Sequence, residues 1–228
     1  MGSSTVTLTA ADGFQFPAYV AEPVGTPKGA IVVLQEIFGV NSHIRSVADG
    51  YAAEGYLAVA PATFTRVKPG VELGYTGPDM GAGMELKAAV EALPAPGVLQ
   101  DVQAAVQYAA KAGKVGIVGY CWGGLLTWRS AEQVQGLSAA VAYYGGGATT
   151  EAEAGRTPKV PVLAHFGDKD QHITLPSVEA FIKRQPEVEV HIYPADHGFN
   201  CDQRGSWDAP AAKLARERSL AFFAKHLG

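Results

Sequence analysis

The sequence predicts an α/β protein built on a mostly parallel, doubly wound sheet of about eight strands. Short continuous apolar runs, such as "GAIVVLQ" (29–35) and "KVGIVGY" (114–120), are typical of strands covered on both faces. Segments with helical spacing alternate with these runs along the chain. The 228 residues are 47% apolar and 18% charged, and no linker divides them, so we expect residues 1–228 to form one domain.

The elements can be predicted in chain order. Alternating segments 5–10 and 14–23 predict a hairpin around Asp12 and Gly13. Strand 29–35 precedes a helix that begins near residue 42, with Ser42 as its expected N-cap. The remaining expected strands are 56–62, 114–120, 137–145, 160–167 and 188–194, and the remaining expected helices lie within 79–92, 98–112, 122–133, 175–184 and 209–228.

Charge and composition exclude several classes of function. The chain has 18 Lys and Arg against 22 Asp and Glu, a formal net charge of −4, which is too mild to indicate a polyanionic partner. No basic cluster is interleaved with aromatic residues, so we expect no nucleic-acid partner. The apolar runs are too short to span a membrane, and the first residues lack the features of a signal peptide. Two cysteines make no disulfide framework, so we expect free thiols and a cytoplasmic protein. We further expect a monomer, or at most a weak dimer, that binds a small molecule.

One cysteine lies on a glycine-flanked turn between a strand and a helix. The sequence from Gly119 to Gly123 reads Gly-x-Cys-x-Gly, which is the nucleophile-elbow pattern with sulfur in place of the more usual hydroxyl. Cys121 would then lie at a helix N-terminus, where the thiolate is favoured. The alternative is an inert cysteine beside a packing turn, because free cysteines are often core residues.

Other polar residues follow the strands at the edge where ligands bind in such sheets. Strand 29–35 ends in "QEIFG", strand 160–167 leads into "GDKDQH", and strand 188–194 leads into "PADHGF". A thiol, acids and a histidine are therefore expected at one edge. Their chain order of nucleophile, acid and histidine is the order found in α/β-hydrolases, and it favours catalysis over packing.

The sequence resembles the dienelactone hydrolase (carboxymethylenebutenolidase) family over essentially its whole length. The residues that carry the resemblance are "QEIFGVN" (35–41), "GYCWGG" (119–124), "GDKDQHI" (167–173) and "DHGFN" (196–200). The resemblance implies an α/β-hydrolase fold without a large cap and hydrolysis of small lactones or esters by a triad of Cys121, His197 and Asp170. It also implies carboxylated enol-lactone substrates from aromatic-ring degradation.

More than one residue competes for the positions of the histidine and the acid. His197 is the histidine on a glycine-containing loop after the final strand, whereas His43 and His172 are candidates to line the cleft. Asp196 adjoins His197 in sequence, which makes pairing with its ring awkward, and Asp168 is expected to cap its own turn. Asp170 is preferred by its position in the motif.

Glu36 is unusual because a carboxylate directly after a buried strand is costly unless it is paired or used. The next residue, Ile37, and Trp122 are expected to supply the two N–H groups of an oxyanion hole. Glu36 would then lie close to Cys121 and keep the resting thiol neutral. The family resemblance implies that Glu36 takes the thiol proton, and the alternative is an ion pair with a nearby arginine.

Arg204 and Arg66 are the candidates to bind a substrate carboxylate, since a guanidinium fits it with two hydrogen bonds. Cys201 is expected to be structural. No zinc-ligand spacing or Cys-x-x-Cys motif is present, so the sequence predicts no metal or other cofactor and no redox role. Two alternatives stay open: a short-chain carboxylesterase or thioesterase for uncharged substrates, and a non-catalytic ligand binder.

Overall fold

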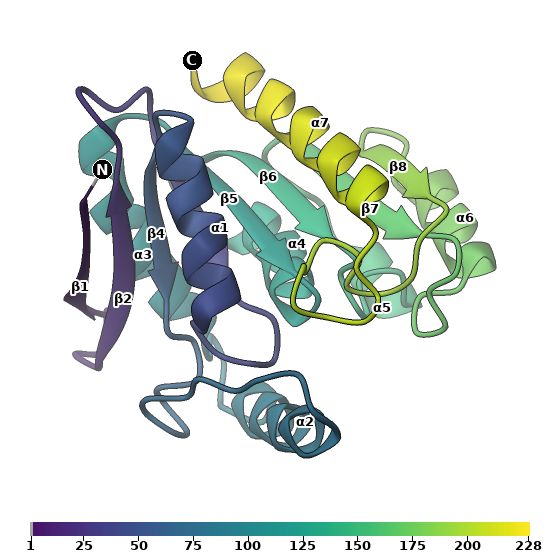
Figure 1. Ribbon diagram of the computed structural model, residues 1–228, viewed down its shortest axis with the longest axis horizontal. Helices are drawn as coiled ribbons and strands as arrows, with labels where there is room; N and C mark the ends of the chain where they lie inside the picture. The colour runs from purple at the N-terminus through teal and green to yellow at the C-terminus, as the bar shows by residue number, and fades with distance from the viewer. Residues whose placement is uncertain (1) are drawn as a thin grey trace.

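The structure, a computed structural model that describes residues 2–228, contains one eight-stranded sheet with helices on both faces (Figure 1). The strand order is β1-β2-β4-β3-β5-β6-β7-β8. β1 pairs with β2, and β2 with β4, in antiparallel fashion, whereas every pair from β4 to β8 is parallel. The predicted fold class is confirmed.

The central strands are buried along their whole length. Every residue of β3, β4, β5 and β7 is buried, as expected for strands covered by helices on both faces. β1 lies at an edge and is mostly exposed. The strands are β1 (Gly2–Thr9), β2 (Gln15–Glu22), β3 (Ala30–Leu34), β4 (Leu57–Pro61), β5 (Val115–Tyr120), β6 (Leu137–Tyr143), β7 (Val162–Gly167) and β8 (Glu189–Tyr193).

The helices form two layers. In Figure 1, α1 and α7 cross the near face of the sheet, and α3 and α4 lie behind it. Trp128 of α4 packs against Phe181 of α6 at a ring separation of 5.2 Å, so α6 extends the far layer. The helices are α1 (Ser42–Ala53), α2 (Gly77–Glu91), α3 (Leu99–Ala109), η1 (Ala110–Ala112), α4 (Trp122–Gln133), α5 (Glu151–Ala154), α6 (Leu175–Arg184) and α7 (Ala209–Leu227).

Two details differ from the sequence-based expectation. Asn41, not Ser42, is the N-cap of α1, because its side-chain oxygen accepts a hydrogen bond from the Ile44 N–H at 3.2 Å. The Ser42 hydroxyl instead bonds to Gln203 at 3.0 Å. The four-residue helix α5 was not predicted, since one turn leaves too short a pattern to detect.

The segment 63–83, which has little sequence pattern, leads into α2 beyond the end of the sheet (Figure 1). Thr76 and Asp79 form a capping box at the start of α2. A Cβ atom at Gly83 would clash with the carbonyl oxygen of Ile37, so α2 packs closely on the chain that follows β3. No separate cap domain is evident among residues 2–228.

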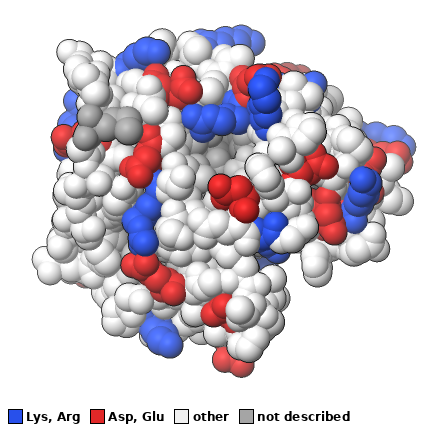
Figure 2. All heavy atoms as spheres, in the orientation of Figure 1, with Lys and Arg blue, Asp and Glu red and all other residues white. Residues whose placement is uncertain are grey.

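Charged side chains are dispersed over the surface. On the face shown in Figure 2, Lys and Arg side chains are interspersed with Asp and Glu. Across residues 2–228, no helix combines the length and the apolar character that a membrane crossing needs.

Candidate active site

Cys121 occupies a strained turn between β5 and α4. Its φ of 57° and ψ of −117° lie outside the regions that residues with a side chain normally adopt. A Cβ atom at Gly119 would clash with the backbone of Gly123, and one at Gly123 would clash with the carbonyl of Gln35. The two glycines therefore allow the tight turn that the elbow pattern predicts, and they bring the end of β3 against the start of α4.

The structure brings Cys121, His197 and Asp170 together. The Sγ atom of Cys121 lies 3.1 Å from Nε2 of His197, and Nδ1 of His197 lies 2.7 Å from Oδ2 of Asp170. These side chains come from three separate connections that follow β5, β7 and β8. Cys121 is partly exposed, whereas the Asp170 side chain is fully buried. The arrangement can pass a proton between a thiol and an oriented imidazole.

In the row formed by Cys121, His197 and Asp170, the surroundings favour the charged forms of Asp170 and His197. Burial disfavours the Asp170 carboxylate, but His197 and the N–H groups of His172 and Ile173 lower its pKa overall. Burial also opposes protonation of His197, yet the adjacent Cys121 sulfur and Asp170 raise the pKa of its ring to about 10. Together these directions favour a protonated His197 ring beside an ionised Asp170.

The two expected oxyanion donors lie on the segments that Gly123 holds together. Trp122 is the first residue of α4, and Ile37 follows β3 by three positions. Within residues 2–228, neither N–H donates to a backbone carbonyl of a turn, a loop or another element. The Trp122 indole is fixed by Glu91, which accepts its N–H at 2.8 Å, and by stacking on Phe64.

Both carboxylate oxygens of Glu36 accept hydrogen bonds from other side chains. Its Oε1 accepts a hydrogen bond from Arg204 at 2.9 Å, and its Oε2 accepts one from the Tyr75 hydroxyl at 3.3 Å. The structure therefore contains the ion pair that was the alternative interpretation of Glu36. Arg204, one of the two predicted carboxylate binders, lies near both Glu36 and Cys121.

Arg66, the other predicted carboxylate binder, forms ion pairs with two carboxylates of the protein itself. It pairs with Asp101 at 2.7 Å and with Asp12 at 2.8 Å, and its guanidinium lies over the ring of Phe14. Asp12 belongs to the β1–β2 turn and Asp101 to α3, so Arg66 ties elements at the β1 end of the sheet. These two carboxylates neutralise the charge of Arg66, which disfavours its predicted role in substrate binding.

Two tyrosines near the site were not identified from the sequence. Tyr75 accepts from Asn41 at 3.1 Å, and burial together with Glu36 raises the pKa of Tyr75. Tyr144 has a φ of 35°, and its ring centroid lies 5.2 Å from that of His197. Tyr144 directly follows β6, whereas the expected strand ran on to residue 145 and hid this signal, and Tyr75 lies in the unpatterned segment 63–83, which gave none.

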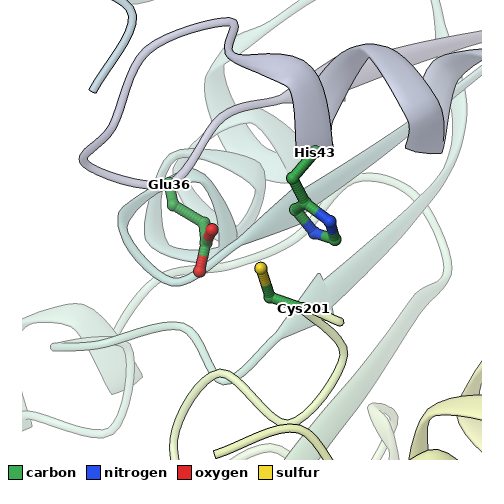
Figure 3. A group of neighbouring side chains, drawn as sticks. All are labelled: Glu36, His43 and Cys201. Carbon is green, nitrogen blue, oxygen red and sulfur yellow. The ribbon is translucent and has the colours of Figure 1, made fainter. Parts of the chain in front are cut away.

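The other histidines occupy distinct positions. His165, within β7, bonds to Tyr193 and Ser219, each at 2.9 Å, and burial lowers its pKa, which indicates a structural role. His172 lies beside the row, with its ring centroid 5.4 Å from that of His197. His43 belongs to a buried group with Glu36 and Cys201 (Figure 3).

Cys201 is fully buried, as expected for a structural residue. Burial and the nearby Glu36 raise the pKa of its thiol to about 11, which disfavours the reactive thiolate. Of the two free cysteines, Cys121 is therefore the one with both exposure and a basic partner.

The parallel sheet and the elbow at the end of β5 define an α/β-hydrolase. The family model for the dienelactone hydrolase family matches residues 16–227, and the chain belongs to this family. It is 34% identical to a carboxymethylenebutenolidase of Pseudomonas putida, over 96% of this chain and 95% of that protein. A Synechocystis protein provisionally named carboxymethylenebutenolidase is 36% identical, with 98% and 97% covered. The chain is thus a hydrolase that acts on ester bonds.

Solved structures agree with this assignment. A provisionally named dienelactone hydrolase from Klebsiella pneumoniae superposes with a TM-score of 0.81 at 32% identity, covering 99% of this chain and all of that one. An esterase from Pyrococcus furiosus shares the fold, with a TM-score of 0.72 at 16% identity over 100% of this chain and 94% of the other.

Proposed function

We propose that this protein hydrolyses small lactones and esters through an acyl-thioester on Cys121, with His197 as general acid and base and Asp170 as its orienting partner. The observation that carries the proposal is the hydrogen-bonded row at the strained elbow, with Sγ to Nε2 at 3.1 Å and Nδ1 to Oδ2 at 2.7 Å. Residues placed in this way match the nucleophile, base and orienting group of acyl-transfer enzymes.

Acylation begins when the Cys121 sulfur attacks the substrate carbonyl carbon. The carbonyl oxygen gains the negative charge and is held by the N–H groups of Ile37 and Trp122. When the intermediate collapses, the bond from carbon to the ring or ester oxygen breaks, and the leaving oxygen takes the proton from Nε2 of His197. We assign the thiol proton to His197 because its Nε2 is in contact with Sγ, whereas Glu36 pairs with Arg204.

Deacylation uses the same histidine in its neutral form. The Cys121 sulfur is one of the groups that raise the pKa of His197. Once that sulfur is acylated it carries no negative charge, so the pKa of His197 falls and its Nε2 becomes able to accept a proton. Water then attacks the thioester, gives its proton to Nε2, and releases the acid product and the Cys121 thiolate.

The substrate follows from the relatives and from the charges near the site. The names of the family members support a lactone of the carboxymethylenebutenolide type. Arg204 is the cation near Cys121 that could meet a carboxylate, and Glu36 already neutralises it. This pairing favours a second candidate, an uncharged short-chain ester.

The nucleophile is tested by comparing the two cysteines. Cys121→Ala should lower kcat for p-nitrophenyl acetate by about 10³-fold or more, because the oxyanion hole cannot replace the attacking atom. Cys201→Ala is the matched control and should keep most of the activity. Acid quenching of the wild-type reaction, followed by peptide mass spectrometry, should find the acyl group on Cys121. The assignment would be overturned if Cys201→Ala lost activity while Cys121→Ala kept it, or if the acyl group were found on another residue.

A further inference from the structure

A second group of potential metal ligands lies beside the proposed catalytic row. One carboxylate oxygen of Glu36, one ring nitrogen of His43 and the Cys201 sulfur all lie within 4.8 Å of one another. Each residue is at most 3% exposed. Figure 3 shows the three side chains converging on one point, from the segment after β3, the first turn of α1 and the loop before α7. The proposed reaction makes no use of His43 or Cys201.

His43 carries an independent sign of a missing ligand. Its Nδ1 lies 3.3 Å from Oδ1 of Asp202, whereas its Nε2 is buried and finds no hydrogen-bond partner anywhere in residues 2–228. A carboxylate at Nδ1 places the ring proton there and leaves a free lone pair on Nε2. Metal-binding histidines are oriented in this way by a carboxylate on their second nitrogen.

We propose that Glu36, His43 and Cys201 bind a thiophilic divalent cation of the zinc class, with water completing the tetrahedron. Thiolate, imidazole and carboxylate are the ligands that Zn²⁺ takes in proteins, whereas Mg²⁺ and Ca²⁺ require sets of oxygen ligands. The ligand spacing of 36, 43 and 201 matches no local motif, so the sequence pattern gave no indication of this site.

The charges nearby suit a divalent ion. Arg204 occupies Oε1 of Glu36, while Oε2 has only the long contact with Tyr75 at 3.3 Å and can still donate a lone pair to a metal. The charges of Arg204 and Glu36 cancel. When the ion binds, the Cys201 thiol loses its proton to water, and the resulting thiolate and the Asp202 carboxylate beside His43 together balance the two positive charges of the ion.

A surface cavity borders the site on the side of His43. Its volume is about 370 Å³, and His43 and Asp202 are among the residues that line it. The Asp202 side chain is 62% exposed, so the carboxylate that orients His43 lies on the solvent side of the ring.

The site shares Glu36 with the active centre, so we expect metal binding to affect turnover. This expectation rests on the proposed function. An ion bound to Glu36 fixes the carboxylate that neutralises Arg204, close to Cys121. Occupancy should therefore slow turnover without contact between the ion and the substrate.

The test measures Co²⁺ binding to the full chain as the Cys121→Ser variant, so that Cys201 is the remaining thiol. We expect about one equivalent of Co²⁺ to bind and to produce thiolate-to-cobalt charge-transfer absorption. Cys121→Ser/Cys201→Ser should lose this absorption, and adding His43→Gln to Cys121→Ser should weaken binding. Mg²⁺ or Ca²⁺ should not compete. The site would be overturned if Cys121→Ser bound no Co²⁺, or if the charge-transfer absorption persisted in Cys121→Ser/Cys201→Ser.

A milder pair of variants keeps the ligands intact. Asp202→Asn, in the Cys121→Ser background, should weaken Co²⁺ affinity by about 10- to 100-fold, the usual effect of losing a carboxylate behind a ligating histidine. The matched control is Asp168→Asn, an exposed aspartate remote from His43 in sequence, which should leave the affinity unchanged. Equal effects from the two variants would contradict the role of His43.

Turnover provides a separate measurement that can fail independently. With p-nitrophenyl acetate and added ZnSO₄, Cys201→Ser should need at least about 10-fold more Zn²⁺ than wild type for half inhibition. Equal inhibition of the two would place the inhibitory ion on Cys121 and refute the coupling to turnover. The Co²⁺ result in Cys121→Ser decides the site itself, because that variant lacks the proposed nucleophile.

Discussion

Arg204 and Glu36 form a buried ion pair next to the candidate nucleophile. The Nη1 atom of Arg204 donates to Oε1 of Glu36 at 2.9 Å, and the side chains are 13% and 1% exposed. Burial opposes the charge of Arg204, but Glu36 and Cys121 outweigh it and raise the Arg204 pKa. The charge of Glu36 is thereby linked to the reacting sulfur through Arg204, although the sulfur itself contacts His197.

Glu36→Gln should change the preference for charged substrates. The variant removes the carboxylate that competes for Arg204, so a carboxylated lactone gains a free cation to pair with. A charge-assisted contact is worth about 1.5–3 kcal/mol, so KM for that lactone should fall by roughly 10- to 100-fold. KM for a neutral ester such as p-nitrophenyl acetate should stay nearly constant. Parallel changes in both KM values would show that Arg204 does not meet the substrate carboxylate.

The same variant separates two assignments of the thiol proton. With Glu36 neutral, the positive charge of Arg204 is uncompensated and favours the Cys121 thiolate, so iodoacetamide should alkylate Cys121 faster at neutral pH. The pre-steady-state burst with p-nitrophenyl acetate should persist, because His197 still accepts the proton. If the burst rate fell by about 10²-fold while the thermal midpoint was unchanged, Glu36 would be the acceptor, as the family resemblance implies. Glu179→Gln, at an exposed position of α6, is the control for charge removal alone.

The sequence predicted the fold because its signals are local. The buried strands β3 and β5 are continuous apolar runs, and the turn around Cys121 carries glycines at the two positions where a Cβ atom would clash. The N-cap of α1 was placed one residue late because Asn41 and Ser42 are both good caps. Local preference could not choose between them.

The side-chain pairings could not be predicted in the same way. Arg66 lies 54 residues from Asp12 and 35 from Asp101, and no pattern in the sequence encodes those contacts. The partner of Glu36 is likewise 168 residues away. Chain order indicated which residues lie at the end of the sheet where the site forms. Which charges neutralise each other there is decided by packing.

Arg66→Ala should affect stability and leave substrate binding unchanged. Asp101 is buried, and loss of its partner leaves a carboxylate without compensation, which costs about 3–5 kcal/mol of unfolding free energy. Urea unfolding should report the loss, and KM for any substrate should be within a factor of two of wild type. The double variant Arg66→Met/Asp101→Leu should recover most of the stability, since no charge is then buried alone. A raised KM for carboxylated lactones only would restore Arg66 as a substrate ligand.

The pH dependence of acylation should follow His197. Its pKa in the free enzyme is raised from 6.5 to about 10, so the ring stays protonated across that window and loses its proton only above it. Because the imidazolium protonates the leaving oxygen, the stopped-flow acylation rate, corrected for spontaneous hydrolysis, should hold from neutral pH to about 10 and then decline. Asp170→Asn removes a group that raises this pKa, so the decline should begin at lower pH, whereas Cys201→Ala should not move it. A wild-type decline centred near 6.5 would show that the Cys121 sulfur does not stabilise the protonated ring.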